Sequence, residues 1–205
     1  MIEKFDNHIK ESYKTCSWIS LYYGNVANLL KTINNPSVYV EIGIAMGFHI
    51  ETLLQEFNEL KCYGIDPYIP YDPSDSFNNI GKIEPSLSVQ QNFDLFCLSV
   101  NDRLSAYKNF NHIRKPSNIA HSMFQDSSID LIFIDGDHTY DAVKNDCSLW
   151  WTKLKNNGIM CWDDYYWDGV KKAVDEFCFT KNLELKSITK NNSYHTMYVV
   201  KGDKD

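Results

Sequence analysis

Two clusters of acidic residues are the parts of this chain best suited to chemistry. Asp135, Asp137 and His138 follow the apolar run Leu131–Ile134, and the pair Asp163 and Asp164 follows a second apolar run at 158–162. Apolar runs of this length are typical of buried strands, and the carboxyl ends of parallel strands meet at one edge of a sheet. The sequence therefore predicts that the two clusters form a single site.

Carboxylates gathered in this way favour a hard divalent cation. Oxygen ligands select Mg²⁺, with Mn²⁺ or Ca²⁺ as substitutes, whereas unpaired carboxylates without a cation repel one another and raise their pKa values. A metal can bring the pKa of a bound water from ~15.7 to ~7, and a bound hydroxyl should respond similarly. His138 belongs to the first acidic cluster, and its ordinary pKa of about 6.5 would let it accept the proton of such a hydroxyl.

A glycine-containing turn is the third candidate element. Glu41, Gly43 and Gly47 lie between an apolar run and a helical pattern, where small residues let the backbone approach a ligand. The dinucleotide fingerprint GxGxxG is absent, because Ala45 and Phe48 stand where it requires glycine. Glu41 would repel a pyrophosphate and would suit a cationic amino group.

Alternating strand and helix patterns predict the scaffold that positions these residues. β-branched and apolar runs predict strands at 38–44, 61–65, 109–114, 129–135 and 158–163, with a closing antiparallel pair at 183–189 and 194–201. Helical spacing predicts helices at 50–57, 86–104, 118–124, 139–155 and 169–179, with Thr139 as an N-cap. This order predicts an α/β fold with a mostly parallel sheet.

The turn, together with Asp66 after the second strand, resembles the class I S-adenosylmethionine (SAM) dependent methyltransferases. The resemblance implies that Gly43 and Gly47 line the SAM pocket, Glu41 faces the amino acid end, and Asp66 holds the ribose hydroxyls. Lys115 and Pro116 depart from the usual glycine after the third strand, and Ala45 departs from the commonest turn. By position, the resemblance also implies cofactor contacts for Pro67, Tyr68, Ser117 and Asp135.

The segments FIDGDHTYDAV and GIMCWDDY narrow the resemblance to the metal-dependent O-methyltransferases, of the catechol and caffeoyl-CoA type and of the macrocin and sugar type. The resemblance spans Val38–Trp167 and implies a Rossmann-like, mostly parallel seven-stranded sheet, helices on both faces and an antiparallel C-terminal strand. It implies that Asp135, Asp163 and Asp164 bind a divalent cation, with Mg²⁺ as the favoured ion. His138 and Asp137 occupy the positions of catalytic groups.

Several of these positions have a structural alternative. His138 could bond to local backbone, and Asp137 could cap the following helix. Asp164 would point away from Asp163 unless the chain turns there. Tyr165, Tyr166 and Trp167 fit either a substrate wall or core packing, and His49, His112, His121 and His195 are expected to be structural.

Composition limits the class of protein. The chain has 205 residues, a net charge of −7 and six cysteines without a CxxC pair. We expect one domain over 1–205 in a reducing, cytoplasmic setting. No basic stripe, signal peptide or run of ~20 apolar residues indicates a nucleic-acid or membrane partner.

Two flanking segments are expected to cover the acceptor. Residues 1–35 contain a helical stripe of Trp18, Tyr22, Val26, Leu29 and Ile33, which predicts a helical cover of the sheet, with a lid or a homodimer contact as alternatives. Residues 67–85 are rich in proline and aromatic residues without a period and are predicted to form an acceptor loop.

The sequence thus predicts SAM-dependent, cation-assisted O-methylation of a small hydroxylated acceptor such as a sugar, a phenol or a natural product. A metal-independent N- or O-methyltransferase and a catalytically silent SAM-binding domain are the alternatives. The identity of the acceptor is not encoded in any motif of the chain.

Overall fold

The described residues form one seven-stranded sheet with helices on both faces. The computed structural model describes residues 2–15, 24–70, 80–189 and 196–202. The strand order is β3-β2-β1-β4-β5-β7-β6. The strands are β1 (Val38–Ile42), β2 (Lys61–Ile65), β3 (Phe110–Ile113), β4 (Ile129–Ile134), β5 (Leu154–Trp162), β6 (Lys186–Ile188) and β7 (Thr196–Val200).

Strand direction confirms the predicted fold class. β1 pairs in parallel with both β2 and β4, and β3 and β5 extend the sheet in parallel on either side. β7 is antiparallel to its two neighbours β5 and β6. The chain order reverses between β1 and β4, so the carboxyl ends of these two strands border the crevice where ligands of such sheets bind.

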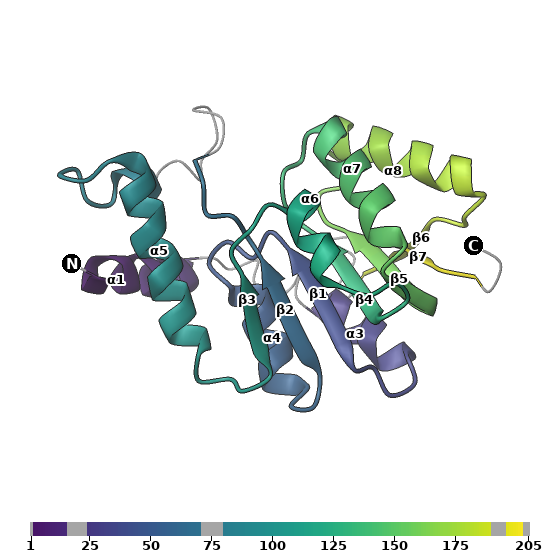
Figure 1. Ribbon diagram of the computed structural model, residues 1–205, viewed down its shortest axis with the longest axis horizontal. Helices are drawn as coiled ribbons and strands as arrows, with labels where there is room; N and C mark the ends of the chain where they lie inside the picture. The colour runs from purple at the N-terminus through teal and green to yellow at the C-terminus, as the bar shows by residue number, and fades with distance from the viewer. Residues whose placement is uncertain (1, 16–23, 71–79, 190–195, 203–205) are drawn as a thin grey trace.

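Alternation along the central strands divides the core into two halves. Tyr39, Leu131 and Phe133 pack on one face, and Val40, Ile132 and Ile134 pack on the other. The first half contains α1 (Ile2–Thr15), α3 (Gly24–Thr32), α4 (Phe48–Glu56) and α5 (Val89–Leu104); the second contains α6 (Ser117–Ala120), α7 (Tyr140–Trp151) and α8 (Asp168–Lys181). Figure 1 shows α7 and α8 side by side over one face, and α1 crossing α5 beside the β3 edge.

The boundary between α7 and β5 corrects one predicted helix. The pattern placed 139–155 in a helix that Asn156, Asn157 and Gly158 would close, but α7 ends at Trp151 and β5 begins at Leu154. Between the pairs Ile129–Leu154 and Leu131–Ile159, β5 advances five residues while β4 advances two. Asn157, with φ 61°, lies in this irregular stretch, so the apparent helix stop is a bulge inside a strand.

The N-terminal region predicted as a helical cover, 1–35, contains a helix ahead of the residues that carried the pattern. α1 covers Ile2–Thr15, and Phe5 and Ile9 are buried in the first core half. The end of the predicted stripe is confirmed by α3, while Trp18 and Tyr22 lie outside the described residues. Most of the predicted acceptor loop, 71–79, also lies outside them. Within the described ranges, no helix is both long enough and apolar enough to cross a membrane.

Candidate active site

The turn after β1 touches the end of β4. Gly43 has φ 86°, and a Cβ placed there would lie 2.1 Å from the carbonyl oxygen of Asp135. Only glycine fits this contact without displacing backbone, because both the conformation and the space exclude a side chain. The glycine turn and the first acidic cluster are therefore directly adjacent.

Gly47 packs against a helix. With φ 71°, it would place a Cβ 2.8 Å from Cδ1 of Leu104 on α5. The guanidinium of Arg103, also on α5, donates to the carbonyl of Met46 and pairs with Glu51 in α4. α5 thus fixes the end of the turn that leads into α4.

Glu41 lies inside the first core half with its charge engaged. Its side chain is only 1% exposed, and its Oε2 accepts a hydrogen bond from the hydroxyl of Tyr39 at 2.7 Å. Nδ1 of His49 lies 2.8 Å from the same oxygen. The predicted contact of Glu41 with an amino group stays a prediction, and the structural role expected for His49 is now specific: it partners a buried carboxylate.

Asp66 and Tyr68 hold the turn from the side of β2. The carboxylate of Asp66 accepts hydrogen bonds from the backbone N–H of Ala45 at 3.0 Å and of Tyr68 at 2.8 Å. Tyr68 is fully buried and donates its hydroxyl to the carbonyl of Ala45 at 2.6 Å. Burial raises the pKa of Asp66 to about 6 against the lowering effect of these bonds and of Arg114. The Tyr68 ring thus packs in the first core half, and its contact with the cofactor stays a prediction.

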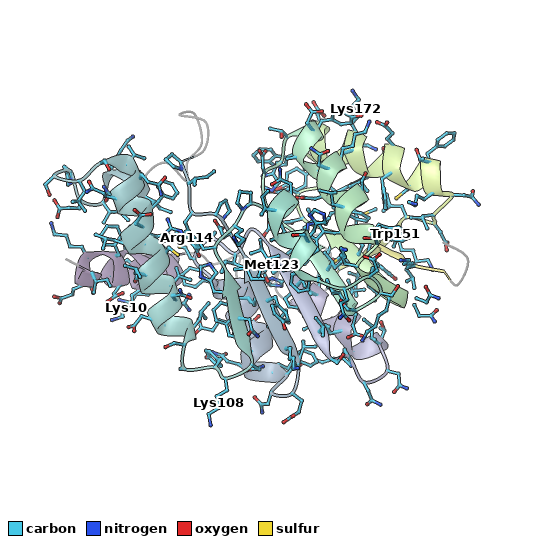
Figure 2. The ribbon with its side chains drawn as sticks, in the orientation of Figure 1. Lys10, Lys108, Arg114, Met123, Trp151 and Lys172 are labelled. Atoms are coloured by element: carbon cyan, nitrogen blue, oxygen red, sulfur yellow. The ribbon has the colours of Figure 1, made fainter. Side chains whose placement is uncertain are left out.

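Arg114 secures the same segment from the end of β3. Its guanidinium donates to the carbonyl oxygens of Pro67 and Tyr68 and pairs with Asp94 on α5. Figure 2 labels Arg114 between the β3 edge and α5. Arg114, which is itself paired with α5, therefore fixes the chain that follows β2.

A cavity of about 410 Å³ opens at the carboxyl ends of the central strands, on the side of α6 and α7. Four of the predicted cofactor or catalytic residues line it: Gly43, Pro67, Ser117 and Asp137. The remaining lining consists of Ile42, Ile65, Ile69, Pro116, Asn118, Gly136, Thr139, Asp141, Ala142, Asn145 and Asp146.

Asp146 is a cavity residue that the sequence patterns did not single out. It lies on α7, is 4% exposed, and accepts a hydrogen bond from the Ser117 hydroxyl at 2.5 Å. Burial raises the pKa of Asp146 to about 6, although the Ser117 bond opposes that shift. Its position three residues after Val143 and four before Trp150, both buried, was the available signal, since it puts an acid near the buried face of a helix.

The two acidic clusters do meet, with His138 between them. Nε2 of His138 lies 3.7 Å from Oδ1 of Asp135 and 3.4 Å from Oδ2 of Asp164. Burial lowers the pKa of His138, but the charges of Asp135 and Asp164 outweigh burial and raise it. Burial raises the pKa of Asp135 to about 6, against the influence of His138. A titratable imidazole therefore joins the ends of β4 and β5.

The chain turns at Asp164. Such a turn was the condition for Asp163 and Asp164 to face the same site. Asp163 N–H still donates to the carbonyl of Ile134 at 3.1 Å, and Asp164 then adopts φ 47°. Burial, and then the neighbouring Asp164, raise the pKa of Asp163 well above its usual range. Within the described part of the chain, no three His, Cys, Asp or Glu side chains are arranged to hold a metal ion.

Asp137 lies just before α7 but is not its N-cap. Its Oδ1 accepts a hydrogen bond from Thr139 N–H at 2.8 Å, and Thr139 caps α7 by accepting from Ala142 N–H. Asp137 thus fixes the turn that precedes α7 while also lining the cavity. The N-cap predicted at Thr139 is confirmed.

Aromatic residues after β5 border the acidic groups. The ring of Trp167 lies 5.0 Å from that of His138 and is 50% exposed, and Tyr166 is 70% exposed. Tyr165 instead bonds to Asp175 on α8. Large exposed apolar rings beside polar groups are typical of ligand surfaces, so Tyr166 and Trp167 fit the substrate-wall reading and Tyr165 the packing reading.

Comparison with known proteins agrees with this geometry. Residues 40–165 match the family model described as a methyltransferase domain. The chain belongs to this methyltransferase family. The match covers the glycine turn, both acidic clusters and the cavity, but excludes α1, α3 and the strands after α8.

One curated relative of the methyltransferase domain is an uncharacterized protein of Acanthamoeba polyphaga mimivirus, 26% identical over 151 residues. That alignment covers 71% of this chain and 59% of the relative, so the chain spans less than two thirds of that relative's length.

Solved structures share the fold at low identity. A candidate caffeoyl-CoA O-methyltransferase from Staphylococcus aureus superposes with a TM-score of 0.64 at 13% identity, covering 95% of this chain and 92% of that one. A SAM-dependent methyltransferase from Aquifex aeolicus gives 0.57 at 12% identity, covering 95% and 96%. The O-methyltransferase NovP gives 0.61 at 15% identity, covering 88% and 77%.

Proposed function

We propose that this methyltransferase domain transfers a methyl group from SAM to a hydroxyl oxygen of a small acceptor. A divalent cation, for which Mg²⁺ is the favoured ion, assists the transfer. The observation that carries the proposal is the contact between Gly43 and Asp135. It sets the turn expected to bind the donor against the carboxylates expected to prepare the acceptor. An oxygen nucleophile must approach the methyl group within about 3–3.5 Å, and this adjacency makes such an approach feasible.

The cavity beside Gly43 suits the adenosine part of SAM. Its walls combine bare backbone at Gly43 and Gly136 with Pro67 and Pro116, and its polar groups include Ser117 and Asp146. Apolar walls combined with fixed polar groups suit a purine. When bound, SAM would supply an electrophilic methyl carbon on a positively charged sulfur.

The chemistry of the acidic donor set fits a hard cation. Asp135, Asp163 and Asp164 would hold it, and burial, which disfavours the negative charge of a carboxylate, raises the pKa values of Asp135 and Asp163. A bound divalent cation would remove that conflict and would lower the pKa of an acceptor hydroxyl. His138 would have to turn away from Asp135 and Asp164 to admit it.

His138 is the group best placed to accept the acceptor's proton. Its Nε2 faces the carboxylates, and the ring of Trp167 lies 5.0 Å from the imidazole. In the proposed reaction the hydroxyl proton would move to Nε2 as the oxygen bonds to the methyl carbon. The bond from that carbon to the sulfur would break, leaving S-adenosylhomocysteine. With the cation held by Asp135 and Asp164, His138 would act only as the proton acceptor.

The position of His138 also favours a second candidate, a methyltransferase that works without a metal. In that reading His138 bridges Asp135 and Asp164 permanently, and the carboxylates raise its basicity instead of binding a cation. The acceptor is then an oxygen or a nitrogen whose proton His138 removes.

Two measurements test the proposal. Calorimetry with S-adenosylhomocysteine is expected to show binding. Mass spectrometry is expected to show methyl transfer from SAM to at least one of a catechol, a simple phenol and a sugar. EDTA should abolish this transfer and Mg²⁺ should restore it. D135N should reduce transfer by roughly 100-fold or more if the carboxylate holds the cation.

The matched control is D126N, which alters an exposed aspartate far from the cavity and should transfer methyl groups at the wild-type rate. Absence of S-adenosylhomocysteine binding would refute the whole proposal. Transfer that is insensitive to EDTA but lost in H138N would leave the metal-free candidate.

A further inference from the structure

The glycine turn after β1 has a left-handed backbone at three of its residues. Gly43 has φ 86°, Ala45 has φ 44° and Gly47 has φ 71°. Ala45 carries a side chain, and such residues keep a positive φ only where the surrounding structure holds them there. The conformation of this turn therefore depends on the groups that bond to it from outside.

The two halves of the turn are held from different parts of the chain. In the first half, the N–H of Ala45 donates to the carboxylate of Asp66, which follows β2. In the second half, the guanidinium of Arg103 on α5 donates to the carbonyl oxygen of Met46. A Cβ placed at Gly47 would lie 3.2 Å from Nη2 of Arg103, so the guanidinium also packs against the backbone of the turn.

Arg103 is itself fixed in one orientation. Its Nη1 pairs with Glu51 of α4, and the centre of its guanidinium lies 5.2 Å from the centre of the Phe48 ring. A guanidinium is planar and directs its N–H groups in a rigid fork, which lets one side chain bond two acceptors in set directions. Arg103 therefore ties the Met46 carbonyl to the helix that follows the turn.

This half of the turn lies outside the cavity. Gly43 lines the cavity that suits the adenosine part of SAM, whereas Met46, Gly47 and Arg103 are not among its lining residues. Glu41, at the start of the same turn, is the residue that the family resemblance sets at the amino acid end of SAM. The support from Arg103 therefore concerns one part of the donor and leaves the adenosine part to the cavity.

We propose that Arg103 is a positioning residue that holds the second half of the glycine turn in the conformation that binds the amino acid part of SAM. The proposal rests on the proposed function and adds a residue that no motif of the chain indicates. Arg103 acts through Met46 and Gly47. Without the guanidinium, the turn populates other conformations, and the affinity for the amino acid part falls by the fraction of competent molecules that is lost.

The experiment compares two ligands by calorimetry. S-adenosylhomocysteine and 5′-methylthioadenosine share the adenosine and the sulfur, but only the first has the amino acid part. R103M should weaken binding of S-adenosylhomocysteine at least about 10-fold, because it removes a charged hydrogen-bond donor. Binding of methylthioadenosine should change by less than about 3-fold. R103K keeps the charge without the fork and should weaken S-adenosylhomocysteine at least about 3-fold.

The matched control is Y107F. It removes a hydroxyl that lies 3.4 Å from the other oxygen of Glu51, and it leaves the bond between Arg103 and Met46 in place. Both affinities of Y107F should equal those of the wild type. A purely structural role of Arg103 would instead lower the free energy of unfolding of the variants without changing the ratio of the two affinities.

The outcomes separate this proposal from the proposed function. An R103M protein with a native circular dichroism spectrum overturns the proposal if it binds S-adenosylhomocysteine as the wild type does, or if it loses both ligands equally. If R103M does not fold, a wild-type ratio of affinities in R103K overturns the proposal instead. In each of these cases the proposed function stands. Absence of S-adenosylhomocysteine binding by the wild type refutes the proposed function, and the role of Arg103 with it.

Discussion

Burial is the largest cause of the pKa shifts of two acids, Asp146 in the cavity wall and Asp66 after β2. Asp66 and Asp146 each have a pKa raised to about 6, and in both cases desolvation is the largest cause. A carboxyl group in an unfolded chain has a pKa near 3.9, so folding weakens the acidity of these groups by roughly two pH units. The ionised forms of these buried carboxyl groups would therefore be favoured in a ligand complex only where the ligand contacts them.

The pH dependence of stability follows from this shift. Between about pH 4 and pH 6 the folded state binds more protons at Asp146 than the unfolded state does, so the free energy of unfolding falls as pH rises through that window. We expect D146N to be more stable than the wild type at pH 7.5, by roughly 1–3 kcal/mol. The difference should shrink as pH is lowered to 5. Urea unfolding at both pH values measures it, and a difference that does not change with pH would contradict the assignment.

At the opposite end of the sheet, an acid with the reverse behaviour joins three strands. Asp130 of β4 accepts from the backbone N–H groups of Ser37 and Val38 where β1 begins, and pairs with Lys155 of β5 at 2.8 Å. Burial tends to raise the pKa of Asp130, but Lys155 and the N–H donors outweigh it and lower the pKa. At pH values above the pKa that Asp130 has in the unfolded chain, its charged form therefore stabilises the fold.

D130N should destabilise the protein by roughly 2–3 kcal/mol at pH 7, since it removes the ion pair and presents an N–H₂ group to donors that need an acceptor. The loss should decrease as pH falls below about 4, where the wild-type acid also becomes neutral. The matched control is D126N, which breaks a second Asp–Lys pair at an exposed site and should leave the free energy of unfolding unchanged. Equal losses in both variants would show that Asp130 is no more than a surface charge.

The elements were predictable where the residue pattern has a single explanation. Leu131–Ile134 and Val38–Ile42 are continuous apolar or β-branched runs, and both are central strands. The start of β5 was predicted wrongly because Asn157 with φ 61° serves equally as a helix stop and as a strand bulge. Only the partner strand, with its pairs at Ile129 and Leu131, decides between them, and that pairing is not local in sequence.

The candidate site was predictable to the same extent. The order of strands brings Asp135, His138 and Asp164 together as their positions after β4 and β5 imply. Tyr68 was singled out only as a cofactor contact, and the sequence did not show that it adopts φ 47° and packs into the core, where its hydroxyl bonds to Ala45. No residue pattern announces a left-handed tyrosine, because the hydrogen bonds that hold it come from distant elements.

At the scale of the molecule, the two core halves differ in how they close. Helices α6, α7 and α8 form a layer over the second half, whereas the first half is completed near β3 by α5 with α1 crossing it (Figure 1). α1 contributes Phe5, which is fully buried, and Ile9, which is 3% exposed. This helix lies within the predicted helical cover, 1–35, but ahead of the stripe from Trp18 to Ile33 on which that prediction rested.

Two alternatives follow for α1. It is either part of the core or a cover that opens by itself. If it is part of the core, F5A should lower the free energy of unfolding of the whole domain by roughly 3–5 kcal/mol, because a buried ring is lost and a cavity is left. I2A, on the exposed side of the same helix, is the matched control and should cost little, since Ile2 is 42% exposed. Urea unfolding followed by Trp fluorescence measures the global change. Amide exchange in α1 reports local opening. Loss of protection confined to α1, with an unchanged urea midpoint, would contradict the integrated core and support a separately opening cover over the acceptor.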